Sequence, residues 1–166
     1  QADVSAADAE ILYSEYFGSA AAATYLQRKP HTDAGQTKNF MDGWCAWKPG
    51  DACNRFAWVI CGKDSSHPNG VILTIRDRHK IEIHFGVSPD FSGQGIASRA
   101  VHLATDWLLS QPGIRRVWTA VDATHTASRR VLANAAYVEE GRLHNWLVLP
   151  ALGPEPRDAI VYARVR

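Results

Sequence analysis

The stretch EIHFGVSPDFSGQGIAS, residues 82–98, combines the end of a strand, a glycine-rich loop and the start of a helix. Apolar and polar side chains alternate over 80–87, which is typical of a strand with one buried face. Glycines 93 and 95 allow a tight turn and a close approach of a ligand to the backbone. The free amides and dipole of the helix over 97–110 would favour an anion such as a pyrophosphate, and a plain structural turn is the alternative.

Two common phosphate-binding motifs do not fit this loop. A P-loop needs a Lys and a Ser or Thr after its last glycine, and the sequence has neither at that spacing. A dinucleotide-binding loop needs a third glycine within a repeating parallel βαβ pattern. Residues 93–98 (GQGIAS) lack that glycine, and the strands before them have an antiparallel pattern.

The segments before residue 82 predict helices followed by an antiparallel meander. Strands are predicted over 55–61 (RFAWVIC), 70–75 (GVILTI) and 80–87, joined by polar turns at 63–70 and 76–79. Helical spacing and capping residues predict three helices before the strands. The first covers 5–17 with Ser5 as its N-cap, and the second covers 20–26. The third runs from the Thr32-Asp33 cap towards Trp44 and is closed by a turn at 48–51.

The segments after residue 98 complete a mixed sheet. A strand is predicted over 116–121, a helix over 126–135, and a closing hairpin of 146–149 with 159–165. The order is helices, three strands, helix, strand, helix and two strands. We therefore expect an α/β fold with a mixed sheet and the strand–loop–helix unit at its centre. The 166 residues suit a single domain over 1–166.

Residues 82–98 resemble the coenzyme A segment of the GCN5-related N-acetyltransferases (GNAT), most closely the RimJ/RimL-like branch. That branch reads E-I-G-Y-x-L-x-P-x-x-x-G-x-G-x-A-[ST]. The residues in register are Glu82, Ile83, Phe85, Val87, Pro89, Gly93, Gly95, Ala97 and Ser98. The family's second motif, which begins N-x-x-S and ends G-F-x-x-E-G, has its counterpart in 125–141. Three positions depart from the family pattern, which are Ser92, His125 and the pair Ala136-Tyr137.

The resemblance implies a GNAT fold with splayed central strands, and acetyl-coenzyme A (acetyl-CoA) as co-substrate without a metal. The acetyl group would pass directly to a primary amine within a ternary complex. The residues implied to bind the cofactor are Phe85, Gly86 and Val87 for the pantetheine arm, Gly93, Gln94, Gly95, Ile96 and Ala97 for the pyrophosphate, and Ser98, His125 and Ser128 nearby. Short basic pairs at 115–116 and 129–130 are surface residues or contacts of the adenosine 3′-phosphate.

Three residues are candidates for the chemistry. Glu82 is the first candidate for general base, directly or through a water, and His84 on the same strand face is the alternative. Ser128 matches the family serine that donates a hydrogen bond to the departing sulfur. The alternatives are a solvated Glu82 paired with His84 or Lys80, and a Ser128 bonded back to a helix carbonyl. Tyr137 is a second candidate acid, although its position favours packing.

Composition limits the partners. The net charge is +1, from 18 basic and 17 acidic side chains, which argues against nucleic-acid binding through bulk electrostatics. No apolar run reaches the length of a membrane span. The cysteines, Cys45, Cys53 and Cys61, form no CxxC pair and are expected to be free thiols. Together with the lack of a signal-peptide pattern at the N-terminus, they favour a cytoplasmic protein.

The acceptor itself is left open between a protein N-terminus and a small-molecule amine. Trp44, Trp47 and Trp58 are candidates for an acceptor pocket or for the core. A non-catalytic acyl-CoA-binding regulator and an antibiotic-acetylating resistance enzyme are the rival functions. An exposed final strand would allow a homodimer.

Overall fold

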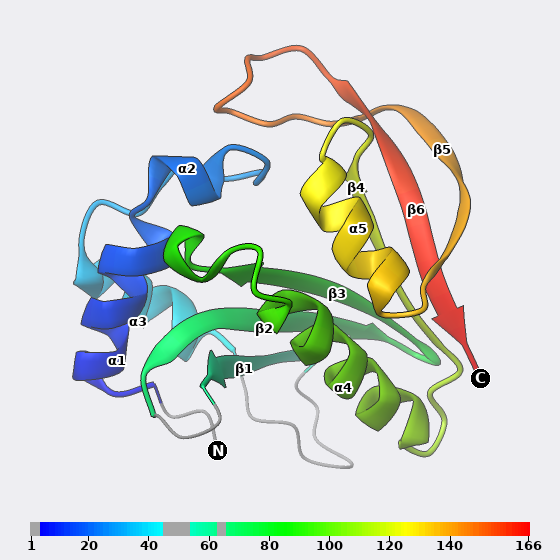
Figure 1. The fold of residues 1–166 in the computed structure, drawn as a ribbon, viewed down its shortest axis with the longest axis horizontal. Helices are drawn as coiled ribbons and strands as arrows, with labels where there is room; N and C mark the ends of the chain where they lie inside the picture. The colour runs from blue at the N-terminus through cyan, green and yellow to red at the C-terminus, as the bar shows by residue number, and fades with distance from the viewer. Residues whose placement is uncertain (1–3, 45–53, 63–65) are drawn as a thin grey trace.

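The computed structural model describes residues 4–44, 54–62 and 66–166, and within them six strands form one sheet (Figure 1). The strand order is β1-β2-β3-β4-β6-β5. The strands are β1 (Arg55–Cys61), β2 (Pro68–Asp77), β3 (Lys80–Val87), β4 (Arg116–Asp122), β5 (Val138–Leu147) and β6 (Arg157–Val165). The first three form the predicted antiparallel meander, and β4, β6 and β5 form a second antiparallel group.

The two groups meet along one short parallel contact. Strand β3 pairs with β4 at three positions only, from Lys80 opposite Arg116 to Glu82 opposite Trp118. Beyond Glu82 the two strands diverge, although β3 continues to Val87 and β4 to Asp122. The crossover between them carries α4 (Ile96–Ser110), as a parallel connection requires. The predicted mixed sheet with splayed central strands is therefore confirmed.

One face of the sheet carries α4 and α5 (Thr126–Asn134), which Figure 1 shows side by side in front of the strands. Ile81 and Ile83 of β3 are fully buried on this face and pack with Val101 and Leu108 of α4. Because successive strand side chains point to opposite faces, Glu82 and His84 point to the other face. The buried face of β3 thus fixes the direction of the candidate catalytic side chains.

The N-terminal helices cover part of that other face. They are α1 (Ala6–Leu12), a π-helical turn η1 (Tyr13–Phe17), α2 (Ala20–Ala23) and α3 (Ala34–Asp42). Ser5 and Asp8 form a capping box at the start of α1, and Asp33 caps α3. Leu12, Tyr16 and Phe17 are buried in one cluster with Val71 of β2, and Leu73 packs against that cluster. The helices therefore lie over the same sheet face as Glu82 and His84.

Several boundaries differ from the sequence predictions. The helix expected over 20–26 ends at Ala23, and a 3-10 turn, η2 (Pro89–Phe91), lies within the loop expected at 88–92. The turn expected at 48–51 lies outside the described residues. The larger error is the last hairpin, because β5 begins at Val138 and ends at Leu147 rather than covering 146–149. Its side chains are mostly exposed, so no hydrophobic alternation marked the strand.

The final strand is also not at an edge. Strand β6 lies between β4 and β5, so the expectation of an exposed final strand is wrong, and β5 forms that edge of the sheet. Among residues 4–44, 54–62 and 66–166, no helix has the length and apolarity needed to cross a membrane.

Replacing Ile81 by Ala should lower the free energy of unfolding by about 2–5 kcal/mol, because the change leaves a cavity in the core between β3 and α4. The measurement is urea unfolding followed by circular dichroism. Val165→Ala is the matched control, since Val165 on β6 is 65% exposed whereas Ile81 is fully buried. That control should shift stability by no more than about 0.5 kcal/mol, and equal losses in both variants would contradict this description of the core.

Candidate functional site

A cavity of ≈ 830 Å³ occupies the split between β3 and β4 and continues beneath the N-terminal helices. Its wall contains most residues that the family resemblance implied, which are Glu82, His84, Phe85, Gly86, Val87, Gly93, Gly95, Ile96, Ala97, Ser98, His125 and Ser128. Gln94 is absent from the wall, and its Nε2 donates to the carbonyl oxygen of Asp90 at 3.2 Å. The fold thus brings the two motifs, which are far apart in sequence, to one place.

The glycine loop forms one end of this cavity. Gly93 and Gly95 both have φ of 76°, a left-handed conformation that favours glycine, and Gly95 is the N-cap of α4. A Cβ built on either glycine would meet no atom within 4 Å, so the space above the loop is open. The first amides of α4 have no carbonyl partner within the helix and carry the positive end of its dipole. These groups fit a pyrophosphate.

The floor of the cavity is the polar face of β3. Nε2 of His84 lies 3.3 Å from Oε1 of Glu82, and both side chains are partly exposed. Burial lowers the pKa of His84, and the Glu82 carboxylate opposes this only in part. His84 is therefore a neutral imidazole near pH 7, able to accept a proton. Lys80, which the sequence offered as another partner for Glu82, pairs with Asp77 at 3.1 Å instead.

The turn between β4 and α5 forms the opposite wall. Buried Asp122 organises it, because its carboxylate accepts from the Thr124 amide at 2.8 Å and from Nε of Arg157 at 2.6 Å. Burial alone would raise the pKa of Asp122, but the bonds from Arg157 and Thr124 outweigh it and hold the pKa below its usual value. The same turn presents His125 and Ser128 to the cavity.

His125 makes a contact that the sequence did not indicate. Its ring stacks on the ring of Tyr25, with centroids 4.0 Å apart and planes 12° from parallel. Burial lowers its pKa, although the charge of Asp122 acts in the other direction. His125 occupies the N-cap position of α5, but its side chain makes no capping hydrogen bond to that helix. A neutral imidazole has one N–H donor and one acceptor nitrogen, so it can both donate and accept, as can the asparagine amide of the family pattern.

Tyr16 is a second wall residue that sequence reasoning missed. A Cβ built on Gly86 would lie 1.9 Å from the Tyr16 hydroxyl oxygen, so the phenol rests directly on the β3 backbone. Burial raises the pKa of Tyr16 and keeps the phenol neutral. Helical spacing indicated a core residue here, but it carried no signal for contact with one glycine of a distant strand. Gly86 therefore provides room for Tyr16.

The remaining candidates divide between the cavity and the core. Trp44 lines the cavity, Trp58 packs against Trp107 of α4 with ring centroids 5.6 Å apart, and Trp47 lies outside the described residues. Tyr137 belongs to the core, as its position in the sequence favoured, because it is buried and its hydroxyl forms a hydrogen bond with Thr105 at 2.7 Å. Burial raises the pKa of Tyr137 to about 12. In the described ranges, no group of His, Cys, Asp or Glu is arranged to hold a metal.

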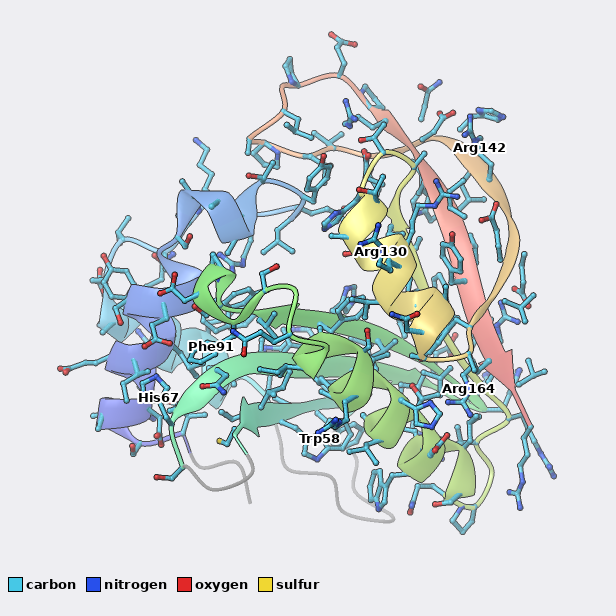
Figure 2. All side chains as sticks on the ribbon, in the orientation of Figure 1. Trp58, His67, Phe91, Arg130, Arg142 and Arg164 are labelled. Atoms are coloured by element: carbon cyan, nitrogen blue, oxygen red, sulfur yellow. The ribbon has the colours of Figure 1, made fainter. Side chains whose placement is uncertain are left out.

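The basic pairs have different surroundings. Arg116 forms an ion pair with Glu140, and Arg129 bonds to the Tyr162 hydroxyl at 3.0 Å. Arg130 lines the cavity, and Figure 2 shows it on α5. Of these three arginines, Arg130 is therefore the one placed to meet a ligand.

Gly86→Ala should lower the free energy of unfolding by about 1–3 kcal/mol, because the new methyl group overlaps the Tyr16 phenol. Adding Tyr16→Ala should make the two effects clearly non-additive, since the second change removes the atoms that clash. Chemical denaturation of the two single variants and the double variant forms the cycle. Additive losses would show that Gly86 and Tyr16 are not in contact.

Comparison with known proteins agrees with this architecture. A family model described as an acetyltransferase (GNAT) domain matches residues 3–137. An uncharacterized N-acetyltransferase p20 from Bacillus licheniformis is 22% identical over 140 residues, covering 84% of this chain and 78% of its own.

Two solved structures show the same fold. RimL, a ribosomal L7/L12 alpha-N-protein acetyltransferase in complex with coenzyme A, superposes with a TM-score of 0.80 at 18% identity, over 97% of this chain and 90% of its own. A spermidine N-acetyltransferase from Vibrio cholerae, in complex with CoA and spermine, gives 0.75 at 13% identity, over 96% and 90%. With a family model that matches most of its length and a split sheet over a glycine loop, the chain belongs to the acetyltransferase (GNAT) family.

Proposed function

We propose that this protein transfers an acetyl group from acetyl-CoA to a primary amine, directly and within a ternary complex. The observation that carries the proposal is a single cavity that joins the Gly93–Gly95 loop to the Glu82–His84 pair. One end has the free amides of a helix start for a pyrophosphate, and the other has proton acceptors for an amine. Both ends of a two-substrate reaction are therefore in one continuous space.

The cofactor half is built from backbone groups. The divergence of β3 from β4 frees the β3 backbone at Phe85–Val87, because no strand of the described residues pairs with that edge there. We assign this edge to the pantetheine arm, and the amides of 93–97 to the pyrophosphate. Ser92 replaces a longer side chain of the family pattern but leaves every amide of the loop in place. Bound acetyl-CoA would supply an activated thioester, and the protein would supply its orientation.

The chemical half needs a proton acceptor for the amine. We assign Glu82 as the base, with neutral His84 3.3 Å away as the alternative acceptor. Ser128, in the opposite wall, would donate its hydroxyl to the leaving sulfur. Ser128 lines the cavity from α5, which supports this role.

The acceptor belongs to the class of primary amines, either a protein N-terminus or a small molecule. The structural relatives act on both kinds, as the names of the RimL and spermidine enzymes state. Aromatic side chains form much of the acceptor wall, including Phe17, Phe40 and Trp44. Membership of the RimJ/RimL-like branch, a single domain over 1–166 and a cytoplasmic location are part of the same proposal.

Coenzyme A at about 100 times its dissociation constant should stabilise the protein by about 2.7 kcal/mol, because it binds the native state only. For a chain of this size that free energy raises the melting temperature by several degrees. Gly95→Ala should reduce the shift, since it strains the loop and places a methyl group in the open space. Differential scanning fluorimetry measures both quantities.

Gly113→Ala is the matched control for this experiment. Gly113 has φ of 80°, a Cβ there also meets nothing within 4 Å, and it does not line the cavity. It should lose stability like Gly95→Ala, by about 1–2 kcal/mol, yet keep the full shift with coenzyme A. An equal loss of shift in both variants, or no shift in the wild type, would reject the assigned cofactor half.

Glu82→Gln should lower kcat by about 100-fold or more while leaving the thermal shift with coenzyme A intact. The wild-type rate should fall on the acid side below pH 6.5, because burial lowers the pKa of His84 and the pair must be unprotonated to accept a proton. In Glu82→Gln the carboxylate no longer stabilises the protonated imidazole of His84, so the pKa of His84 falls further. The acid limb of the activity that remains in this variant should therefore move to lower pH.

His84→Gln distinguishes the two candidate bases. If Glu82 is the base, this variant keeps most of the wild-type kcat and only changes the shape of the pH profile. A full rate in Glu82→Gln together with loss of rate in His84→Gln would transfer the role of base to His84. The rate of thiol release from acetyl-CoA is the measurement for all three proteins.

A further inference from the structure

The segment that follows α2 crosses from one half of the split sheet to the other. Residues 25–28, which we name the α2 strap, all line the cavity. Figure 1 shows this part of the chain extending from the N-terminal helices towards the end of β4 and the start of α5. The strap thus spans the opening that the divergence of β3 and β4 leaves.

The strap is held at both ends. At one end, Nη1 of Arg28 donates to the carbonyl oxygen of Phe17 at 3.2 Å, which ties the strap to the N-terminal helices. At the other end, the Tyr25 ring stacks on His125 with centroids 4.0 Å apart. Tyr25 also packs against a small buried cluster of Leu147, Leu149 and Ala159, from the β5 and β6 side of the molecule. Its ring therefore connects the two sheet halves.

The position of Tyr25 has a consequence for the acceptor. Tyr25 and its partners His125, Leu147 and Leu149 belong to the wall of the same cavity as Glu82 and His84. A ring fixed on both sides by packing cannot turn aside without breaking its stack, so it takes up space that a larger acceptor would need.

We propose that Tyr25 is the specificity-determining residue for acceptor size, acting as a wall that the His125 stack holds in place. The proposal rests on the proposed acetyltransfer at the same site. It makes His125 a positioning residue towards the acceptor as well as a candidate cofactor contact. Small amines reach Glu82 and His84 with the wall closed, and bulky amines are rejected.

The test compares two amino-acid amides, glycinamide as the small acceptor and tryptophanamide as the bulky one. In Tyr25→Ala, the ratio of kcat/KM for tryptophanamide to that for glycinamide should rise about 10-fold or more, because the wall is removed. Tyr25→Phe keeps the stacked ring and should keep the wild-type ratio. Tyr13→Ala, which removes another tyrosine of the N-terminal helices from outside the cavity, should also leave the ratio unchanged.

An unchanged ratio in Tyr25→Ala would overturn the proposal, because a purely structural residue would lower both rates together. A second readout requires no turnover. Amide hydrogen exchange across 24–28 should become faster in Tyr25→Ala and in His125→Ala but not in Tyr13→Ala, and equal exchange in all of them would show that the stack does not hold the strap. Failure of the proposed function is distinct, since the wild type would then release no thiol from acetyl-CoA with either amide, whereas the hydrogen-exchange readout would still test the strap.

Discussion

The parallel contact between β3 and β4 ends after three residue pairs, and the rest of the site depends on that early end. If the strands continued side by side, their backbone groups would bond to each other and close the space between them. Their divergence instead leaves an edge of β3 free for a ligand, at the cost of a sheet held together by a short contact. The cavity, the glycine loop and the candidate catalytic pair all border this opening.

Other parts of the structure compensate for the split. Ile81 and Ile83 pack β3 onto α4, and the packing of α4 and α5 links that helix to the second half of the sheet. On the opposite face, Tyr16 rests on Gly86, and Tyr25 crosses to His125. The α4–α5 packing and the Tyr25–His125 stack join the two halves through side chains rather than strand pairing. A stable frame around an open site is the result.

The sequence was sufficient for the parts of the fold that have local signals. Alternation in 80–87, the glycines at 93 and 95, and the helical spacing after them predicted the strand–loop–helix unit, and family motifs placed residues 125–128 beside it. The sequence was insufficient for an exposed strand, which has no hydrophobic alternation, and for contacts between residues that are far apart in the chain. Strand β5 is an exposed edge strand, and Asn145 within it has a positive φ of 51° together with an irregular register, so neither alternation nor regular spacing marked it.

The contacts of Tyr16 and Tyr25 illustrate the second limit. Each tyrosine fits a helical or turn pattern by itself, and only the folded chain brings one to Gly86 and the other to His125. The same holds for Glu82, because the sequence left its partner open between His84 and Lys80. In the structure Lys80 pairs with Asp77 across the turn between β2 and β3, and His84 lies beside Glu82. Sequence patterns thus predicted which residues form the cavity floor, whereas the pairings across the cavity needed the three-dimensional arrangement.

The cofactor site is tested most directly by mapping the backbone amide resonances of the protein by NMR while coenzyme A is added. We expect large shifts at the amides of 93–97, at 85–87 on the free edge of β3, and at 125–128 in the opposite wall. Resonances of the β5 edge strand, outside the cavity up to Asn145, should stay in place. Shifts confined to another surface, or none at saturating coenzyme A, would contradict the claim that the split between β3 and β4 is the cofactor site.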